Sequence, residues 1–275
     1  EHFEKGEDYK RAAEYYKKSG AKATNSGAMT ESVDYARKTI YCLEKLPKSE
    51  EVLKKIIDIR TILGIRLMDL NYFHQSKGMI SSIIKTAGEM GRARRVAQIN
   101  TILGAYSFCV SEDFIQTFDH HYHSLGIARN LKDNNLLAMT HYWLGWPLAF
   151  SCDFKGAVDH FTKALDIHIQ AGNRIWIPII YALTGHIAYH YWGRQKHAYE
   201  YSNKAVFLAD ESGDIRRGGQ VRLIHRKLLR LRRRFRGSSQ QNHDRRRCGC
   251  QGAAGRRRDT APTTGNQHHI ILPEI

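Results

Sequence analysis

Proline and long apolar runs are scarce in this sequence, and each shortage excludes a class of structure. Only 5 of the 275 residues are proline, so long uninterrupted helices are permitted. The longest almost uncharged apolar run, Ile175 to Leu183, is much shorter than the roughly 20 residues that a membrane-spanning helix requires. The first residues (EHFEKGEDYK) are charged and lack a signal-peptide pattern, so we expect no export and no membrane partner.

Cysteine is also rare, and the 5 cysteines are an odd number. Cys42, Cys109 and Cys152 lie in helical patterns, which is typical of reduced residues in a protein core. We therefore expect a cytoplasmic protein rather than a secreted protein stabilised by disulfides.

Motifs for nucleotide binding and catalysis are absent as well. The sequence contains no GxxxxGK(S/T), GxGxxG, GxSxG or HExxH pattern. His186 and His190, four residues apart, have the spacing of a two-histidine metal site, but no third ligand is predictable. Histidines that pack or face solvent are the favoured interpretation. We predict no catalytic, cofactor or metal site and no enzymatic activity.

The positive charge is concentrated at one end of the chain. Residues 1–215 contain 27 Lys and Arg against 24 Asp and Glu, whereas residues 216–275 contain 16 against 3. Of those last 16 basic residues, 15 are arginine. The change in composition predicts a near-neutral folded region over 1–215 and a basic, low-complexity tail over 216–275.

An internal repeat of 40 to 41 residues runs through the near-neutral region. The tetrapeptide TILG at 61–64 recurs at 101–104, and a Leu-Gly pair returns at 144–145. Asp113-Phe114 likewise matches Asp153-Phe154. Self-similarity at a fixed period of this length predicts a solenoid of stacked units.

Apolar residues within each unit follow three- and four-residue steps, so each unit is predicted to be a helical hairpin. We expect about five hairpins and no β-structure. The predicted helix pairs are 7–19 with 28–46, 50–70 with 74–89, 92–110 with 112–130, 134–151 with 153–171, and 173–192 with 194–211.

The spacing of Leu144-Gly145, Ala157, Phe161 and Ala164 resembles that of a tetratricopeptide repeat (TPR). Small residues let two helices approach closely, and a large apolar residue fills the space beside them. The period exceeds the usual 34 residues and approaches that of HEAT hairpins, so the repeat subtype stays open. The fold class is therefore an all-α, TPR-like solenoid. The predicted packing residues are Leu63, Gly64, Leu103, Gly104, Leu144, Gly145, Ala157, Phe161, Ala164, Ala198 and Ala205.

Segments 9–20 and 42–47, followed by the long-period repeats, are similar to one class of bacterial regulator. These regulators join a class III adenylate or guanylate cyclase domain, a predicted ATPase of the STAND/AAA type, and a C-terminal TPR-like array. The resemblance implies that this chain is a fragment of such a signalling protein, acting as a protein-binding scaffold or sensor. It also implies an upstream ATPase/cyclase domain as a partner, stacked on the first hairpin.

Aromatic residues concentrate in the first helices of the last two hairpins, where they form either inter-helix core or a binding surface. First helices of such hairpins line a concave groove that commonly receives a protein or peptide segment. Projecting the repeat outward predicts these groove residues: Gln98, Thr101, Phe108, Tyr142, Trp146, Phe150, Ile187, His190 and Tyr191.

Two interpretations of the basic tail remain open. It is either an Arg-rich segment that binds nucleic acid, or the product of a frameshift near codon 216. Both predict disorder from residue 216 and no stable helix across 221–235. We therefore also expect the apolar face of the last hairpin, 194–211, to be uncovered.

Overall fold

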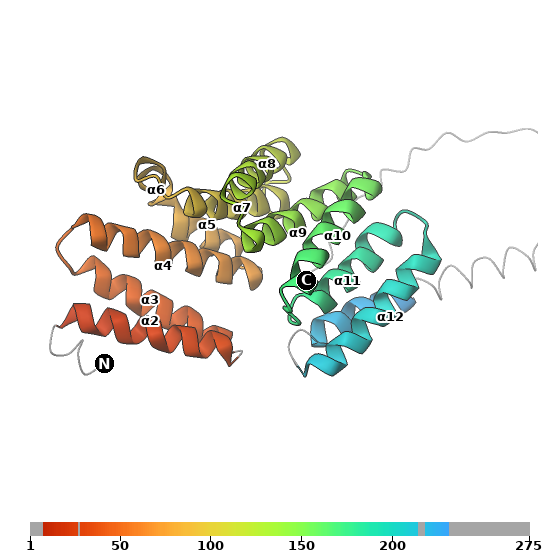
Figure 1. Ribbon diagram of the computed structural model, residues 1–275, viewed down its shortest axis with the longest axis horizontal. Coiled ribbons are helices and arrows are strands. Elements are labelled where there is room, and N and C mark those ends of the chain that lie inside the picture. The colour runs from red at the N-terminus through yellow and green to blue at the C-terminus, as the bar shows by residue number, and fades with distance from the viewer. Residues whose placement is uncertain (1–7, 27, 214–217, 231–275) are drawn as a thin grey trace, which may run out of the picture.

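The computed structural model describes residues 8–26, 28–213 and 218–230, and no strand occurs in these segments (Figure 1). The first six helices are α2 (Tyr9–Asn25), α3 (Met29–Glu44), α4 (Glu50–Asp69), α5 (Phe73–Ser81), α6 (Ile84–Glu89) and α7 (Ala93–Cys109). They are followed by α8 (Phe114–Leu131), α9 (Asn134–Phe150), α10 (Phe154–Gln170), α11 (Ile177–Leu183), the π-helix η1 (Thr184–Tyr189) and α12 (Gln195–Ser212). Residues 218–230 form one more helix.

Consecutive helices pair as hairpins, which confirms the predicted all-α, TPR-like solenoid. The pairs are α2 with α3, α4 with α5, α7 with α8, α9 with α10, and α11 with α12. Two predicted helices are interrupted. The second helix of the α4 hairpin divides into α5 and α6, and the first helix of the last pair continues from α11 into η1.

The repeated Asp-Phe pairs mark the start of the second helices. The Asp113 side chain accepts a hydrogen bond from the backbone N–H of Gln116 at 3.0 Å. The Asp153 side chain accepts one from the backbone N–H of Gly156 at 2.9 Å. An aspartate at this position satisfies a backbone N–H that has no partner within the helix. The 40-residue match therefore repeats a helix boundary, which is why it is visible in the sequence.

Glycines in the first helices permit the close approach of the second helices. A Cβ at Gly145 would lie 2.6 Å from the Phe161 ring, and one at Gly104 would lie 2.7 Å from the His121 ring. Leu63, Leu144, Ala157, Phe161, Ala164, Ala198 and Ala205 are fully buried, whereas Leu103 is partly exposed. The hairpins therefore pack through small residues opposite one large side chain.

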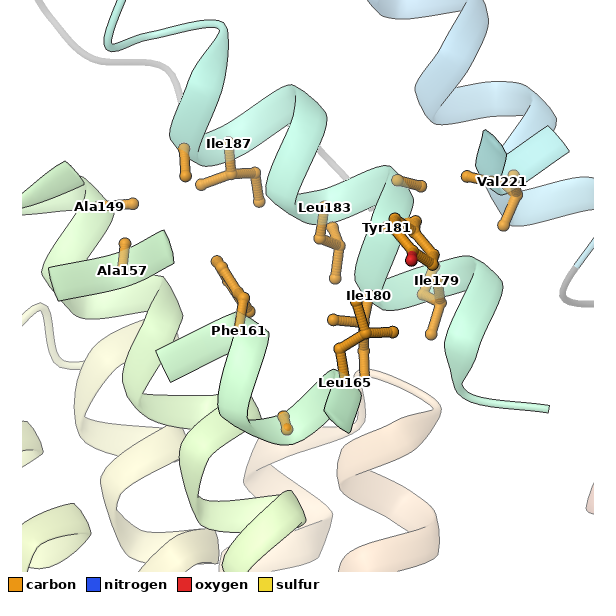
Figure 2. Close-up of a cluster of buried hydrophobic side chains, with 14 of the residues drawn as sticks. Ala149, Ala157, Phe161, Leu165, Ile179, Ile180, Tyr181, Leu183, Ile187 and Val221 are labelled. Carbon is orange, nitrogen blue, oxygen red and sulfur yellow. The ribbon is translucent and has the colours of Figure 1, made fainter. Parts of the chain in front are cut away.

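The helix over 218–230 contradicts two expectations, disorder from residue 216 and an uncovered last hairpin. Val221 and Leu228 are fully buried, and Val221 joins the core cluster that includes Ala205 and Ala209 of α12 (Figure 2). His225 Nδ1 lies 2.8 Å from the Ser202 hydroxyl on α12. This helix therefore covers α12 and extends the array beyond the predicted boundary.

The high arginine content of the tail made this helix hard to predict from composition. The arginines lie on its exposed face, and the buried apolar residues lie on its packed face. Val221, Ile224 and Leu228 lie at helical spacing on the packed side. The exposed residues of the same helix are Gly219, Arg222, Leu223, Arg226 and Arg230. A largely polar outer face is what a terminal helix of a solenoid requires. Residues 231–275, which hold most of the predicted tail, lie outside the described part of the chain.

Candidate functional site on the layer of first helices

The first helices α4, α7, α9 and η1 contact one another in sequence and form one layer of the solenoid. The second helices α5, α8, α10 and α12 pack against this layer. Within the described segments, no helix has the length and apolar character needed to cross a lipid bilayer.

A partly exposed apolar surface lies on α9. Met139, Tyr142 and Trp146, which we call the aromatic stripe, follow one another at three- and four-residue steps and share one side of the helix. The Tyr142 ring centroid lies 6.5 Å from that of Trp146 and 5.6 Å from that of Trp176. The stripe therefore continues toward the next hairpin through Trp176.

The indole N–H of Trp146 is buried without a hydrogen-bond partner. Buried donors in folded proteins are almost always paired, because an unmade hydrogen bond costs about 1–3 kcal/mol. This donor lies on a side chain that is itself partly exposed. Because the nitrogen itself is buried, an acceptor that approaches along the aromatic stripe reaches it only if the indole ring turns outward.

The other residues predicted to line a groove are divided between interior and surface. Thr101 is fully buried, and its hydroxyl lies 3.0 Å from that of Ser124 on α8. Phe108 is buried against Phe150, with ring centroids 5.4 Å apart. Thr101 therefore faces α8, and Phe108 packs between Phe114 of α8 and Phe150 of α9 rather than facing solvent.

The predicted residues near η1 differ in the same way. Ile187 and His190 are buried, whereas Tyr191 is 60% exposed. His190 Nδ1 donates to Gln195 Oε1 at 3.0 Å, because the Gln195 amide nitrogen donates to the His190 carbonyl at 3.2 Å. Burial lowers the pKa of the neighbouring His186 to about 4. His186 is therefore a neutral packing residue near neutral pH.

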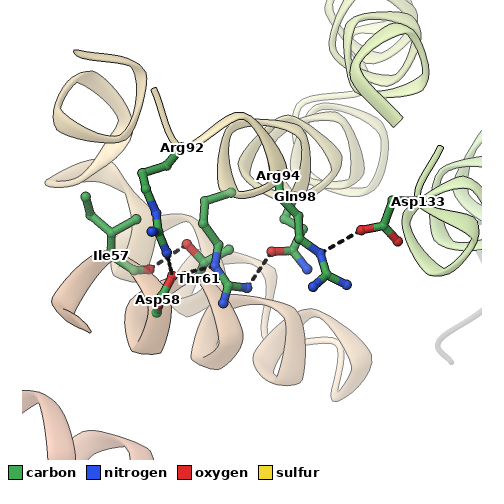
Figure 3. A network of polar contacts seen from close by, with 8 residues as sticks. Ile57, Asp58, Thr61, Arg92, Arg94, Gln98 and Asp133 are labelled. Atoms are coloured by element: carbon green, nitrogen blue, oxygen red, sulfur yellow. Dashed lines mark hydrogen bonds and ion pairs between the residues drawn. The ribbon is translucent and has the colours of Figure 1, made fainter. Parts of the chain in front are cut away.

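Gln98 belongs to a polar network that joins α4, α7 and α9 (Figure 3). Asp58 Oδ1 accepts from Arg92 Nη2 at 2.6 Å and from Arg95 Nε at 2.7 Å. Arg95 also donates to Gln98 Oε1 at 2.8 Å. On the α9 side, Arg94 Nε lies 2.8 Å from Asp133 Oδ2.

The polar network, defined as Asp58, Arg92, Arg94, Arg95, Gln98 and Asp133, has one more guanidinium than carboxylate. Burial alone would raise the pKa of Asp58, but hydrogen bonds from Arg95 and Arg92 more than offset it and hold the pKa below its usual value. Arg94 is about half exposed. The network thus keeps Asp58 ionised and leaves excess positive charge at the surface.

Sequence reasoning missed the arginines of this network. A signal was present, because Arg92, Arg94 and Arg95 cluster at the start of a first helix. Asp58, the partner of Arg92 and Arg95, lies more than 30 residues earlier. Only the stacking of α7 on α4 brings these charges together.

Several histidines gather in pairs, but no group of three or more potential metal ligands occurs among the described residues. His121 is fully buried, and burial is the main cause that lowers its pKa to about 3. His141 and His160 lie against each other with Nδ1 atoms 3.0 Å apart.

No protein-family model matches the sequence, and no curated protein matches it. Solved structures do resemble it. A Rap protein in complex with competence and sporulation factor is 19% identical, with a TM-score of 0.68, over 79% of this chain and 59% of the Rap chain. Aspartyl phosphate phosphatase F from Bacillus subtilis is 13% identical, with a TM-score of 0.57, over 85% of this chain and 62% of its own.

The apo form of RapI is 16% identical, with a TM-score of 0.53, over 82% of this chain and 85% of its own. This chain spans about three fifths of the length of the first two proteins. At these identities the likeness shows the fold, a TPR-like helical repeat.

Proposed function

We propose that this protein is a non-catalytic scaffold or sensor that binds a protein or peptide segment on the layer of first helices. The observation that carries the proposal is the unpartnered Trp146 N–H on a partly exposed aromatic stripe. A bound segment would supply a carbonyl acceptor to this donor and an apolar side chain to Tyr142. In a protein of this fold, a Rap protein, a bound factor accompanies the repeat array.

The positive charge of the polar network supports the same proposal. Arg94 is half exposed beside the stripe-bearing helix α9, and the network as a whole is positive. A segment with an acidic side chain several residues from an apolar one would match both features, because Arg94 pairs at the start of α9 whereas Trp146 lies near its end. Contacts of this kind give orientation and on-rate, whereas the aromatic stripe supplies affinity.

We further propose that the array belongs to a cytoplasmic bacterial signalling protein with an ATPase or nucleotide cyclase domain. This proposal rests on the sequence resemblance of segments 9–20 and 42–47 alone. The hairpin of α2 and α3 would stack on the preceding domain, so that segment binding could change the activity of the parent protein.

Selection from a peptide library tests the binding proposal. Peptides selected on the full chain should bind the Trp146→Phe variant at least tenfold more weakly, because the N–H donor and part of the ring are lost. Tyr122→Phe, an exposed aromatic on α8 outside the first-helix layer, is the matched control and should bind normally. Selected peptides that bind both variants equally would refute the proposed surface.

A second candidate, nucleic-acid binding, is favoured by one observation. Arg226 and Arg230 are exposed on the same side of an ordered helix, and the sequence continues with further arginines. Arginines in this arrangement neutralise phosphates and make affinity depend strongly on salt.

Titration with single-stranded RNA at several salt concentrations tests this candidate. Replacing Arg226 and Arg230 with Gln should lower the slope of log affinity against log salt by about 1.4. Arg174→Gln, an exposed arginine on another part of the surface, is the control. An unchanged slope in the double variant would exclude a role for this helix in RNA binding.

A further inference from the structure

Two imidazole rings meet between α9 and α10, away from the aromatic stripe and the polar network. His141 Nδ1 and His160 Nδ1 are 3.0 Å apart, and the ring centroids are 4.8 Å apart with the planes inclined at 55°. His141 is buried, whereas His160 is partly exposed, so the pair is reachable from solvent through His160. In the neutral pair one ring donates its Nδ1 proton to the other ring.

The preceding hairpin contains the same contact with a different residue. Asn100 on α7 and His120 on α8 occupy positions about 40 residues earlier, and Asn100 Oδ1 lies 3.0 Å from His120 Nδ1. The Asn100 amide nitrogen donates to the Val96 carbonyl at 2.9 Å, so Oδ1 is the atom that faces the histidine. An amide oxygen can therefore serve as the hydrogen-bond partner of the histidine at this position. A second histidine is not needed to hold the two helices together.

The separation of the two nitrogens suits one bound metal ion. With metal–nitrogen bonds of about 2.0–2.1 Å, donors 3.0 Å apart subtend an angle of about 95° at the metal. The metal then lies to one side of the line between the two nitrogens, so both rings must tilt from their hydrogen-bonded orientation to direct Nδ1 at it. That angle is close to the right angle between neighbouring ligands in square and octahedral complexes, and it is narrower than the tetrahedral angle that Zn²⁺ prefers. Imidazole ligands with this geometry suit Cu²⁺ and Ni²⁺.

We propose that His141 and His160 form a two-histidine site for a divalent transition-metal ion of the Cu²⁺ or Ni²⁺ class. Each Nδ1 lone pair forms one bond to the metal. The proton that the two nitrogens shared moves to Nε2 of the ring that carried it, so no net proton is released. The remaining coordination positions are occupied by water, because no third His, Cys, Asp or Glu joins the pair within the described segments.

The charges around the pair are nearly balanced. Lys163 on α10 acts on both rings, and its ammonium group is paired with Asp159 at 2.6 Å. Arg129 on α8 also acts on both rings, and it is exposed to solvent. Asp159 offsets Lys163, and Asp153 also acts on His160 with the opposite sign to Arg129. The repulsion on a bound cation therefore comes from one exposed group that water and salt screen.

Isothermal titration of the untagged full chain with Ni²⁺ tests the proposal. His141→Asn recreates the Asn–His contact of the preceding hairpin, so it should keep the fold and lose one equivalent of Ni²⁺, or bind it at least tenfold more weakly. In the opposite direction, Asn100→His should add a second pair with His120 and gain one equivalent.

Electron paramagnetic resonance with Cu²⁺ identifies the ligands. The wild-type spectrum should show coupling to two imidazole nitrogens, and this coupling should be absent from His141→Asn. Equal Ni²⁺ stoichiometry and affinity in the wild type and a folded His141→Asn variant would overturn the proposal. If a folded Asn100→His variant bound no more Ni²⁺ than the wild type, the geometric argument behind the proposal would be overturned.

Discussion

Single residues at one repeated position decide how closely the two helices of each hairpin approach. Ile80, His121 and Phe161, spaced 41 and 40 residues apart, lie against Gly64, Gly104 and Gly145 respectively. The same position thus carries an aliphatic, a titratable and an aromatic side chain. Phe161 is among the packing residues predicted from the sequence, whereas His121 is not, because histidine is rarely found at a core position.

Adding a methyl group at one of these glycines should destabilise the fold. In Gly145→Ala the new Cβ would lie 2.6 Å from the Phe161 ring, so the hairpin must open, at a cost of about 1–3 kcal/mol. Gly126→Ala on α8 meets nothing within 4 Å and should be neutral or stabilising. Urea denaturation of both variants measures the difference, and equal stabilities would contradict the packing argument.

His121 should make stability depend on pH. Its pKa is about 3 in the folded protein against 6.5 in the unfolded chain, chiefly because burial disfavours the charged ring. The unfolded chain therefore binds a proton first as the pH falls. The contribution of His121 is complete above pH 6.5 and is lost progressively toward pH 3.

Replacing this ring by a phenyl group should remove that dependence. Between pH 6.5 and 5.0, the wild type should lose roughly 2 kcal/mol more unfolding free energy than His121→Phe. Denaturant titrations at the two pH values make the comparison. A parallel loss in both proteins would show that protonation of His121 is not linked to unfolding.

At the scale of helices, the helix over 218–230 changes the description of the C-terminal end. Its buried side chains complete the cover of α12, and Arg222 pairs with Asp210 of that helix. Mean composition could not predict this, because 15 arginines in 60 residues outweigh a few well-spaced apolar side chains. Helical spacing within 221–228 was the informative feature.

Replacing a leucine by alanine should have different effects on the two sides of this helix. Leu228→Ala removes a fully buried side chain and should cost about 2–5 kcal/mol, whereas Leu223→Ala alters a half-exposed one and should change stability by less than about 0.5 kcal/mol. Thermal unfolding of both variants gives the comparison. If Leu228→Ala were as stable as Leu223→Ala, the segment would not pack on α12.

At the scale of the whole molecule, the core is a series of neighbouring clusters. One cluster joins α2 and α3 to α4, and another joins α9 and α10 to α11, α12 and the last helix. Figure 1 shows these groups at opposite ends of the array. In a solenoid each unit is stabilised by its neighbours, so distant units can unfold separately.

A destabilising substitution at one end of the array should therefore leave the other end folded. Leu43→Ala removes a buried side chain from the N-terminal cluster and should speed amide hydrogen exchange in α2 and α3. Exchange in α9 and α10 should remain at the wild-type rate. Hydrogen-exchange mass spectrometry measures both regions in one experiment, and uniform acceleration would indicate a single cooperative unit.

The sequence by itself determined the repeat period, the hairpins and most of the packing positions. These properties depend on spacing along one chain, such as the Asp-Phe helix starts and the glycines opposite Ile80 and Phe161. Tertiary structure alone decided which first-helix residues face solvent. Thr101 and Phe108 are buried, while Trp146 stays partly exposed and Arg94 and Arg95 meet acids from two other helices. Exposure and charge pairing depend on how successive hairpins rotate and stack, and residue spacing within one helix does not specify that rotation.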